Sequence, residues 1–216
     1  MKTMRLVYGF GINDLDIPTR YFDENGVEKK IPSYRRWNGM IRRAYDEKFH
    51  KTHPHYIGCT VSDKWKYFSK FKEWYDSHMK ENDLNYHLDK DLLIPGNKVY
   101  SPENCVFIPR EINCLIIKCD SARGQYPIGV HYHIRDHKFQ SSCKYYDLNT
   151  RKSINKFLGY YATPQDAANA YVEYKSEIIR NVIPTVDQYS LSDEMKDRIK
   201  KGLQVHIQLL QEGSYG

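Results

Sequence analysis

The sequence predicts an α+β protein: a helical amino-terminal region leads into a ββα unit, followed by a three-stranded antiparallel sheet packed on one helix and by a carboxyl-terminal helix. Three observations predict this class. Apolar residues recur every three or four positions in some segments, alternate with polar residues in others, and are separated by turn-forming residues. Because the 216 residues are 40% apolar and 14% aromatic, we expect two small cores rather than one large core.

The amino-terminal part is predicted to contain a turn-rich arm and two helices. Residues 1–33 indicate an irregular arm or a short hairpin, with Asn25-Gly26 as the tight turn. Residues 34–45 have the spacing of an amphipathic helix, and Ser33 is placed to cap it. A second helix is predicted over residues 62–79, because its aromatic residues share one face and therefore belong to the core.

A change of period marks the ββα unit. Alternating apolar residues indicate a strand around residues 84–88, and a short apolar run indicates a second strand at 106–108. Residues 110–118 can form the helix of this unit. A linker is expected at residues 119–125, where the helical and the strand periods both lapse.

The carboxyl-terminal part predicts a sheet backed by a helix. Three short strands are expected, at residues 128–132, 138–144 and 154–161. A well-marked helix follows, since Thr163 can cap it and Pro164 suits its first position. A last helix is predicted over residues 192–210.

These elements divide the chain into five expected segments. They are an arm (1–33), a ββα domain with its preceding helices (34–118), a linker (119–125), a domain of three strands and one helix (126–182), and a carboxyl-terminal helix and tail (183–216).

Charge and cysteine content narrow the classes of protein. A net charge of +6 favours a polyanionic partner without deciding one. No long apolar run predicts a membrane span or a secretory signal, so we expect a soluble, cytoplasmic protein without a membrane partner. The five cysteines form no Cys-x-x-Cys pair, and His53, His55 and Cys59 have no obvious fourth ligand. Zinc is therefore not expected.

The most specific group of polar residues lies in the ββα unit. Strand alternation places His87, Asp89 and Asp91 on one face, while Asn104 and Asn113 come from the following loop and helix. Carboxylate and amide oxygens that converge in this way suit a hard divalent cation such as Mg²⁺. Such an ion could polarise a phosphate and stabilise a leaving alkoxide.

Three short motifs in this region resemble the carboxyl-terminal half of phage-type HNH endonucleases, a group that contains homing enzymes. They are Leu-Asp-Lys-Asp at residues 88–91, Tyr-Ser-Pro-Glu-Asn-Cys at 100–105 and Glu-Ile-Asn at 111–113. Residues 34–45 and 61–74 are similar to the amino-terminal part of that group, so the resemblance covers about residues 5–118. It implies DNA hydrolysis with one Mg²⁺ or Mn²⁺ per active site, in the cytoplasm of a bacterial host.

The resemblance also implies roles for individual residues. Asp89 and Asn113 become metal ligands, with Asp91 as a further candidate, and Asn104 organises the loop. Lys90 holds the position of the general base, where the family has histidine. A lysine could act as the base only if uncharged, whereas a charged one could bind the scissile phosphate instead. His87 is the alternative base, and a third alternative is that catalysis has been lost.

Residues 126–180 are similar to the plant ethylene-response-factor type of DNA-binding domain, which also occurs fused to phage HNH nucleases. In that fold, three strands backed by a helix enter the major groove of double-stranded DNA. The alternation along the middle strand supports such a use, because one face can pack on the helix while the other meets DNA. The residues expected on the DNA face are Lys138, Gln140, Ser142 and Lys144.

Further basic residues could contact phosphates or bases. Arg135, Arg151, Lys152 and Lys156 lie in or beside the strands, and residues 123–156 carry a net charge of +5. Arg42 and Arg43 on the first predicted helix either grip phosphates or form a solvated basic face.

Two hypotheses follow for the function. The first is a phage-type, metal-dependent HNH DNA endonuclease whose carboxyl-terminal sheet binds duplex DNA. The second is a catalytically inactive DNA-binding or regulatory protein on a decayed HNH fold, which Lys90 favours. The sequence predicts no specific protein partner, target sequence or oligomeric state.

Overall fold

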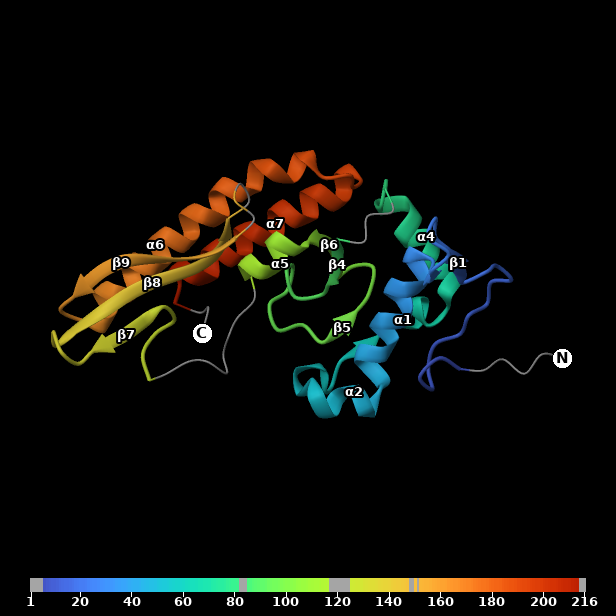
Figure 1. Ribbon diagram of the computed structural model, residues 1–216, viewed down its shortest axis with the longest axis horizontal. Helices are drawn as coiled ribbons and strands as arrows, with labels where there is room; N and C mark the ends of the chain where they lie inside the picture. Colours follow the sequence, from blue (N-terminus) through green and yellow to red (C-terminus); the bar gives the residue numbers. More distant parts are fainter. Residues whose placement is uncertain (1–5, 82–84, 117–124, 148–149, 151, 214–216) are drawn as a thin grey trace. The chain divides into compact units, whose positions relative to one another are not determined.

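The computed structural model describes residues 6–81, 85–116, 125–147, 150 and 152–213 (Figure 1). The chain forms two compact units. The first comprises residues 1–107 and 190–198, and the second comprises residues 108–189 and 199–216. Both contain helices and strands, so the predicted α+β class is confirmed. No helix among the described residues is long and apolar enough to cross a membrane.

The amino-terminal arm contains the hairpin that its turn residues predict. Strands β1 (Arg20–Phe22) and β2 (Glu28–Lys30) pair antiparallel. In the turn between them, Asp23 Oδ1 accepts hydrogen bonds from two backbone N–H groups, and Gly26 has a φ of +71°. Glycine is favoured there because it adopts positive φ without a steric penalty.

Helix α1 (Pro32–Tyr45) begins one residue before the predicted cap, so the assignment of Ser33 as the cap is wrong. Pro32 occupies the first turn, where its missing N–H costs no hydrogen bond, and Ser33 is buried inside the helix. The helix packs against α4, and its inner face consists of Trp37, Met40, Ile41 and Ala44.

The second predicted helix is broken into α3 (Asp63–Lys66) and α4 (Phe68–His78). Tyr67 between them has an extended backbone and forms a parallel bridge with Ile12. Ile12 accepts from the Phe68 N–H at 2.9 Å and donates to the Lys66 carbonyl at 2.8 Å. The aromatic period was right, but the arm replaces the helical hydrogen bonds at this position.

The remaining strands of the first unit are short. A short helix α2 (Glu47–Thr52) and a 3-10 turn η1 (Pro54–Tyr56) lead into β3 (Thr60–Val61), which pairs parallel with β5 (Val99–Tyr100). Strand β4 (Tyr86–Asp89) pairs with β6 (Val106–Pro109), and α5 (Arg110–Ile116) follows. Leu84 and residues 117–118 of the predicted ββα unit lie outside the described residues.

The expected domain limits differ from those of the two units. The division falls inside β6, between Phe107 and Ile108, so α5 belongs to the second unit. Most of the expected linker, residues 119–124, lies outside the described residues. Helix α7 (Asp193–Gln211) confirms the predicted last helix, but its first turns belong to the first unit. There, Ser192 N–H donates to the His78 carbonyl at 2.9 Å.

The second unit contains the predicted antiparallel sheet. Strands β7 (Val130–His133), β8 (Lys138–Asp147) and β9 (Lys152–Tyr161) pair in that order, and α6 (Pro164–Val182) runs along the sheet (Figure 1). Thr163 caps α6, because its Oγ1 accepts from the Asp166 N–H at 3.1 Å. The small core between sheet and helix contains Val130, Ala167 and Ala168, with Tyr126, Phe139 and Tyr161 packed against them.

Candidate functional site

Strand β4 places His87 and Asp89 on the same face, as the alternation predicts. Tyr86 and Leu88 are buried, whereas His87 is exposed and Asp89 is half-buried. The strand ends at Asp89, because its Oδ1 accepts hydrogen bonds from the next two available backbone N–H groups, those of Asp91 at 2.8 Å and Leu92 at 2.7 Å. Asp91 therefore lies in a loop and not on the strand face, where alternation would have placed it.

The Asp89 carboxylate combines burial with a fixed orientation. Burial raises the pKa of its carboxyl above the ordinary value, although the backbone hydrogen bonds and Lys90 oppose that shift. No side chain among the described residues forms an ion pair with Asp89. A half-buried carboxylate of this kind gains from a bound cation, which offsets the cost of its burial.

Lys90 is buried, and its ammonium is occupied by the adjacent loop. Nζ donates to both carboxylate oxygens of Asp91, at 2.8 and 2.7 Å, and to the Asn97 carbonyl at 2.6 Å. These contacts engage all three N–H donors of a charged lysine. These contacts favour a structural role for Lys90, which holds the loop. The same ammonium also occupies both carboxylate oxygens of Asp91.

The Ser-Pro-Glu-Asn segment forms a tight turn that carries Asn104. The Asn104 N–H lies 3.2 Å from both the Oγ and the carbonyl of Ser101, which is buried. The next carbonyl in the turn, that of Glu103, accepts a 2.6 Å hydrogen bond from Nη2 of Arg198 on α7. No local signal in the sequence pointed to Arg198, because it lies far down the chain from this turn.

The other residues considered as metal ligands are Asn113 and the group His53, His55 and Cys59. Asn113 is half-buried on α5 and belongs to the second unit, whereas Asp89 belongs to the first. In the part of the chain that is described, no three His, Cys, Asp or Glu residues group as metal ligands. Cys59 is buried, and burial raises the pKa of its thiol. The His53 ring stacks instead on Phe49, with centroids 4.0 Å apart.

The two arginines of α1 have different environments. Arg42 is exposed and forms an ion pair with Asp46 at 3.3 Å. Arg43 is half-buried, and its Nε donates to the Tyr100 hydroxyl at 3.0 Å. Its guanidinium also lies over the Tyr56 ring at 5.8 Å. Arg42 therefore remains on the surface, whereas Arg43 is directed towards the protein interior.

The middle strand of the sheet has the expected two faces. Ser141 and Cys143 are fully buried on the side of α6. The alternating residues face the other way: Lys138 and Lys144 are exposed, while Gln140 and Ser142 are half-buried. We refer to this side as the outer face. In an antiparallel pair, residues directly opposite each other share a face, so the register assigns residues of β7 and β9 to it.

A β-bulge changes which residues of β9 lie on the outer face. Pairing shifts from Ser141↔Gly159 to Ser142↔Phe157, which leaves one extra residue, Leu158, in β9. Phe157 is therefore on the outer face, although alternation from Gly159 would place it on the helix side. Gly159 has a φ of +138°, and a glycine inside a strand is the feature of the sequence that could have indicated this bulge.

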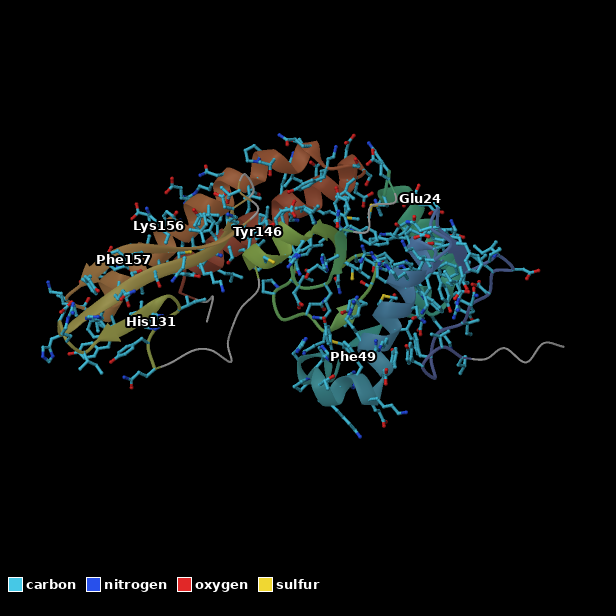
Figure 2. All side chains as sticks on the ribbon, in the orientation of Figure 1. Glu24, Phe49, His131, Tyr146, Lys156 and Phe157 are labelled. Atoms are coloured by element: carbon cyan, nitrogen blue, oxygen red, sulfur yellow. The ribbon has the colours of Figure 1, made fainter. Side chains whose placement is uncertain are left out.

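The register shows on which face two of the predicted DNA-binding lysines lie. Lys152 pairs with Asp147 and Lys156 with the buried Cys143, so both lysines lie on the helix side of the sheet. Phe157 and Tyr160 take the outer face instead, with side chains 51% and 42% exposed (Phe157, Lys156 and His131 are labelled in Figure 2). These two rings contact each other at 5.1 Å, and no basic pattern pointed to them.

The remaining predicted contacts lie outside the strands. Arg135 is in the turn between β7 and β8, with its side chain 84% exposed and its Nε donating to Asp136 at 3.0 Å. Arg151 lies outside the described residues. His131 and His133 share the outer face with Gln140 and Lys138, their cross-strand partners.

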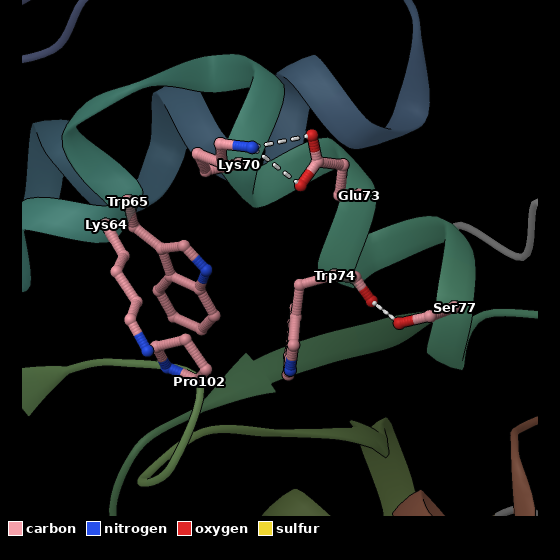
Figure 3. Close-up of a pocket in the computed structure, with 7 residues that line it drawn as sticks. All are labelled: Lys64, Trp65, Lys70, Glu73, Trp74, Ser77 and Pro102. Atoms are coloured by element: carbon pink, nitrogen blue, oxygen red, sulfur yellow. Dashed lines mark hydrogen bonds and ion pairs between the residues drawn. The ribbon is translucent and has the colours of Figure 1, made fainter.

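A pocket of about 310 Å³ lies elsewhere in the first unit, and none of the predicted site residues lines it (Figure 3). The rings of Trp65 and Trp74 meet in it at 4.7 Å, and Pro102 covers one side. Its two lysines are neutralised, since Lys70 pairs with Glu73 at 3.0 Å and Lys64 with Glu103 at 3.6 Å. Trp65, Trp74 and Pro102 give the pocket an apolar part, and each of its lysines has an acidic partner.

The chain matches no family model, no curated protein and no solved structure.

Proposed function

We propose that this protein is a divalent-metal-dependent DNA endonuclease of the HNH type, which binds duplex DNA through the outer face of its sheet. One observation carries the catalytic part. Asp89 ends a strand with one carboxylate oxygen held by two backbone N–H groups, without an ion pair among the described residues, and with His87 on the same face. A carboxylate held in this way has one oxygen oriented for a cation.

The residues present suit Mg²⁺ or Mn²⁺. Mg²⁺ binds through one or two carboxylates and keeps several waters, so Asp89 with an amide oxygen is a sufficient donor set. Asn113 is the ligand that the resemblance implies, and Asp91 could join only by giving up a contact with Lys90. When bound, the ion would polarise the scissile phosphate and stabilise the departing oxygen.

In the proposed reaction, His87 takes the role of general base. Its imidazole accepts the proton of the attacking water, since an imidazole ordinarily titrates near neutral pH and this one lies on the exposed face beside Asp89. Lys90 is less suited, because its ammonium donates three hydrogen bonds within the loop. The resemblance gives Asn104 the role of organising the loop, and its turn is held by Ser101 and Arg198.

The outer face of the sheet supports duplex binding. It presents Lys138 and Lys144 for phosphates, Gln140 and Ser142 for base edges, and the Phe157 ring for thymine methyl groups. Polar, basic and apolar side chains on one exposed strand surface are the components of major-groove recognition by a β-sheet.

Plasmid cleavage tests the catalytic proposal. Supercoiled plasmid incubated with the purified protein and Mg²⁺ or Mn²⁺ should be nicked or linearised, and Asp89→Ala should abolish this activity. Asp16→Ala removes an exposed carboxylate from the same unit and should cleave like the wild type. Cleavage by Asp89→Ala at the wild-type rate would contradict the proposal. His87→Ala should lower the rate more than Lys90→Arg, which retains the charge.

The contacts of Lys90 favour one alternative, a DNA-binding protein without nuclease activity. If Lys90 replaces the family's base only to hold the loop, the site could bind without cleaving. Salt-sensitive binding to duplex DNA, with no cleavage in Mg²⁺, Mn²⁺ or other divalent ions, would select this alternative.

A further inference from the structure

A column of rings covers the short segment that follows α1. Phe49 on α2 lies between two partners: the Arg42 guanidinium is 4.7 Å from its ring centroid, and the His53 ring stacks on it at 4.0 Å with an interplanar angle of 8°. Phe49 is labelled in Figure 2. His55 and Tyr56 extend this ring surface, with centroids 4.3 Å apart, and His55 is 5.9 Å from His53. We call Phe49, His53, His55 and Tyr56 the ring column.

The ring column is not part of the core. Helix α2 has six residues and η1 has three, and none of these residues is buried. Asp46 caps α2 by accepting from the Lys48 and Phe49 N–H groups at 3.0 and 3.3 Å. Isolated helices this short are marginal in water, so the cap and the stacking hold a set of rings at the surface instead of burying them.

The histidines of the column are not arranged for metal binding. Nδ1 of His53 lies 2.8 Å from the Thr52 hydroxyl, and its ring is flat against Phe49. The nearby Cys59 is buried, whereas His55 is exposed. His55 is exposed and His53 is half-buried, so both rings have surface that is open to solvent, as stacking on a base requires.

Positive charge surrounds the rings. Lys48 and Lys51 are exposed on α2, and Nζ of the exposed Lys98 donates to the His55 carbonyl at 2.6 Å. Arg42 lies at the base of the column. The acidic side chains in the same segment are Asp46 and Glu47, and Asp46 is engaged by the helix cap and by Arg42. The segment therefore combines π-faces with an excess of cations.

We propose that the ring column binds single-stranded nucleic acid, with unpaired bases stacked on His53 and His55 and phosphates bound by Lys48, Lys51 and Lys98. Exposed rings flanked by cations are the components of sequence-tolerant single-strand sites. Bases inside a duplex already have both faces covered by their neighbours, so stacking selects unpaired bases. An acidic peptide would satisfy the lysines and leave the ring faces without a partner. This inference does not depend on cleavage or on the sheet.

Fluorescence anisotropy with a labelled oligothymidylate at low salt tests the proposal. The double variant His53→Ala/His55→Ala should bind at least about five-fold more weakly, the loss expected for one stacked base. Phe49→Leu keeps apolar volume but removes the ring beneath His53, and it should also weaken binding. Phe22→Ala removes a ring that is 71% exposed on β1 of the same unit and should bind normally.

Separate measurements distinguish this proposal from the others. Lys138→Ala/Lys144→Ala in the sheet should weaken duplex binding while oligothymidylate binding is kept, and Asp16→Ala should change neither. Circular dichroism and thermal unfolding check that each variant is folded. Wild-type oligothymidylate affinity in the folded double variant would overturn the proposal. Equal losses for duplex and single strand, or displacement of the oligonucleotide by polyglutamate at equal charge, would overturn it as well.

Discussion

Lys90 and Asn97 hold each other through reciprocal hydrogen bonds. Lys90 Nζ donates to the Asn97 carbonyl at 2.6 Å, and Asn97 Nδ2 donates to the Lys90 carbonyl at 2.9 Å. Asn97 Nδ2 also reaches the Val99 carbonyl at 2.8 Å, at the start of β5. The two side chains therefore close the loop between β4 and β5, and the buried position of Lys90 follows from this pairing.

This pairing predicts that Lys90→Met acts through the loop. The variant removes three hydrogen bonds from a buried position, and we expect the free energy of unfolding to fall by about 1–3 kcal/mol, measured by urea denaturation. If Lys90→Met also slows plasmid cleavage through the loop, Asn97→Ala should lower both the free energy of unfolding and the cleavage rate in the same way. If Lys90→Met abolished cleavage while Asn97→Ala retained it, Lys90 would have a chemical role.

Arg198 should affect the candidate site although it is remote in sequence. Its Nη2 holds the Glu103 carbonyl at 2.6 Å, directly before Asn104. We expect Arg198→Ala to slow plasmid cleavage and to lower the free energy of unfolding by about 1 kcal/mol, while Arg198→Lys restores part of both. Glu194→Ala removes only a weak 4.0 Å partner of Arg198 and is the matched control. Unchanged cleavage by Arg198→Ala would show that Arg198 does not support the candidate site.

Asp89 should make the metal-free protein less stable as the pH rises. Its folded pKa is raised by burial, so the folded state binds more protons than the unfolded state. Stability is then lost as pH rises from the ordinary pKa of Asp, near 3.8, through the raised value. Asp89→Asn keeps the Oδ1 acceptor and removes the charge. It should therefore raise the free energy of unfolding at pH 7, and raise it by less at pH 4.

Adding a divalent metal should favour the wild type over Asp89→Asn in stability, the reverse of the order expected without metal. A divalent ion that binds the folded state through Asp89 stabilises the wild type by mass action. Mg²⁺ or Mn²⁺ should therefore raise the thermal midpoint of the wild type and leave Asp89→Asn unchanged. Equal shifts for both proteins would show that the ion binds elsewhere.

The sheet register predicts which lysines contribute to duplex affinity. Lys138 and Lys144 are on the outer face, whereas Lys156 pairs with Cys143 on the helix side. Each outer-face Lys→Ala variant should weaken duplex binding and lower the slope of log affinity against log salt by about 1. Lys156→Ala should leave affinity and slope unchanged. A loss with Lys156→Ala equal to that with Lys144→Ala would contradict the assignment of faces.

The elements that could be predicted from sequence are those specified by neighbouring residues. Thr163 and Pro164 mark the start of α6, Asn25-Gly26 marks the hairpin turn, and alternation along β8 separates its two faces. Capping, positive φ and side-chain alternation act over a few positions, so they can be recognised without knowledge of the rest of the chain. The position of Asp89 on the same strand face as His87 follows from the same alternation.

Other features depended on contacts between distant segments. Ile12 breaks the second predicted helix at Tyr67 by taking its hydrogen bonds, and the bulge at Leu158 moves Lys156 to the helix side. Arg198 reaches the turn before Asn104 from a helix far down the chain. These positions depend on which segments meet in three dimensions, and a local pattern does not contain that information. Residue types and local patterns therefore indicated the fold class and the candidate chemistry, whereas tertiary pairing decided where a helix breaks, where strand alternation slips and which distant residues meet.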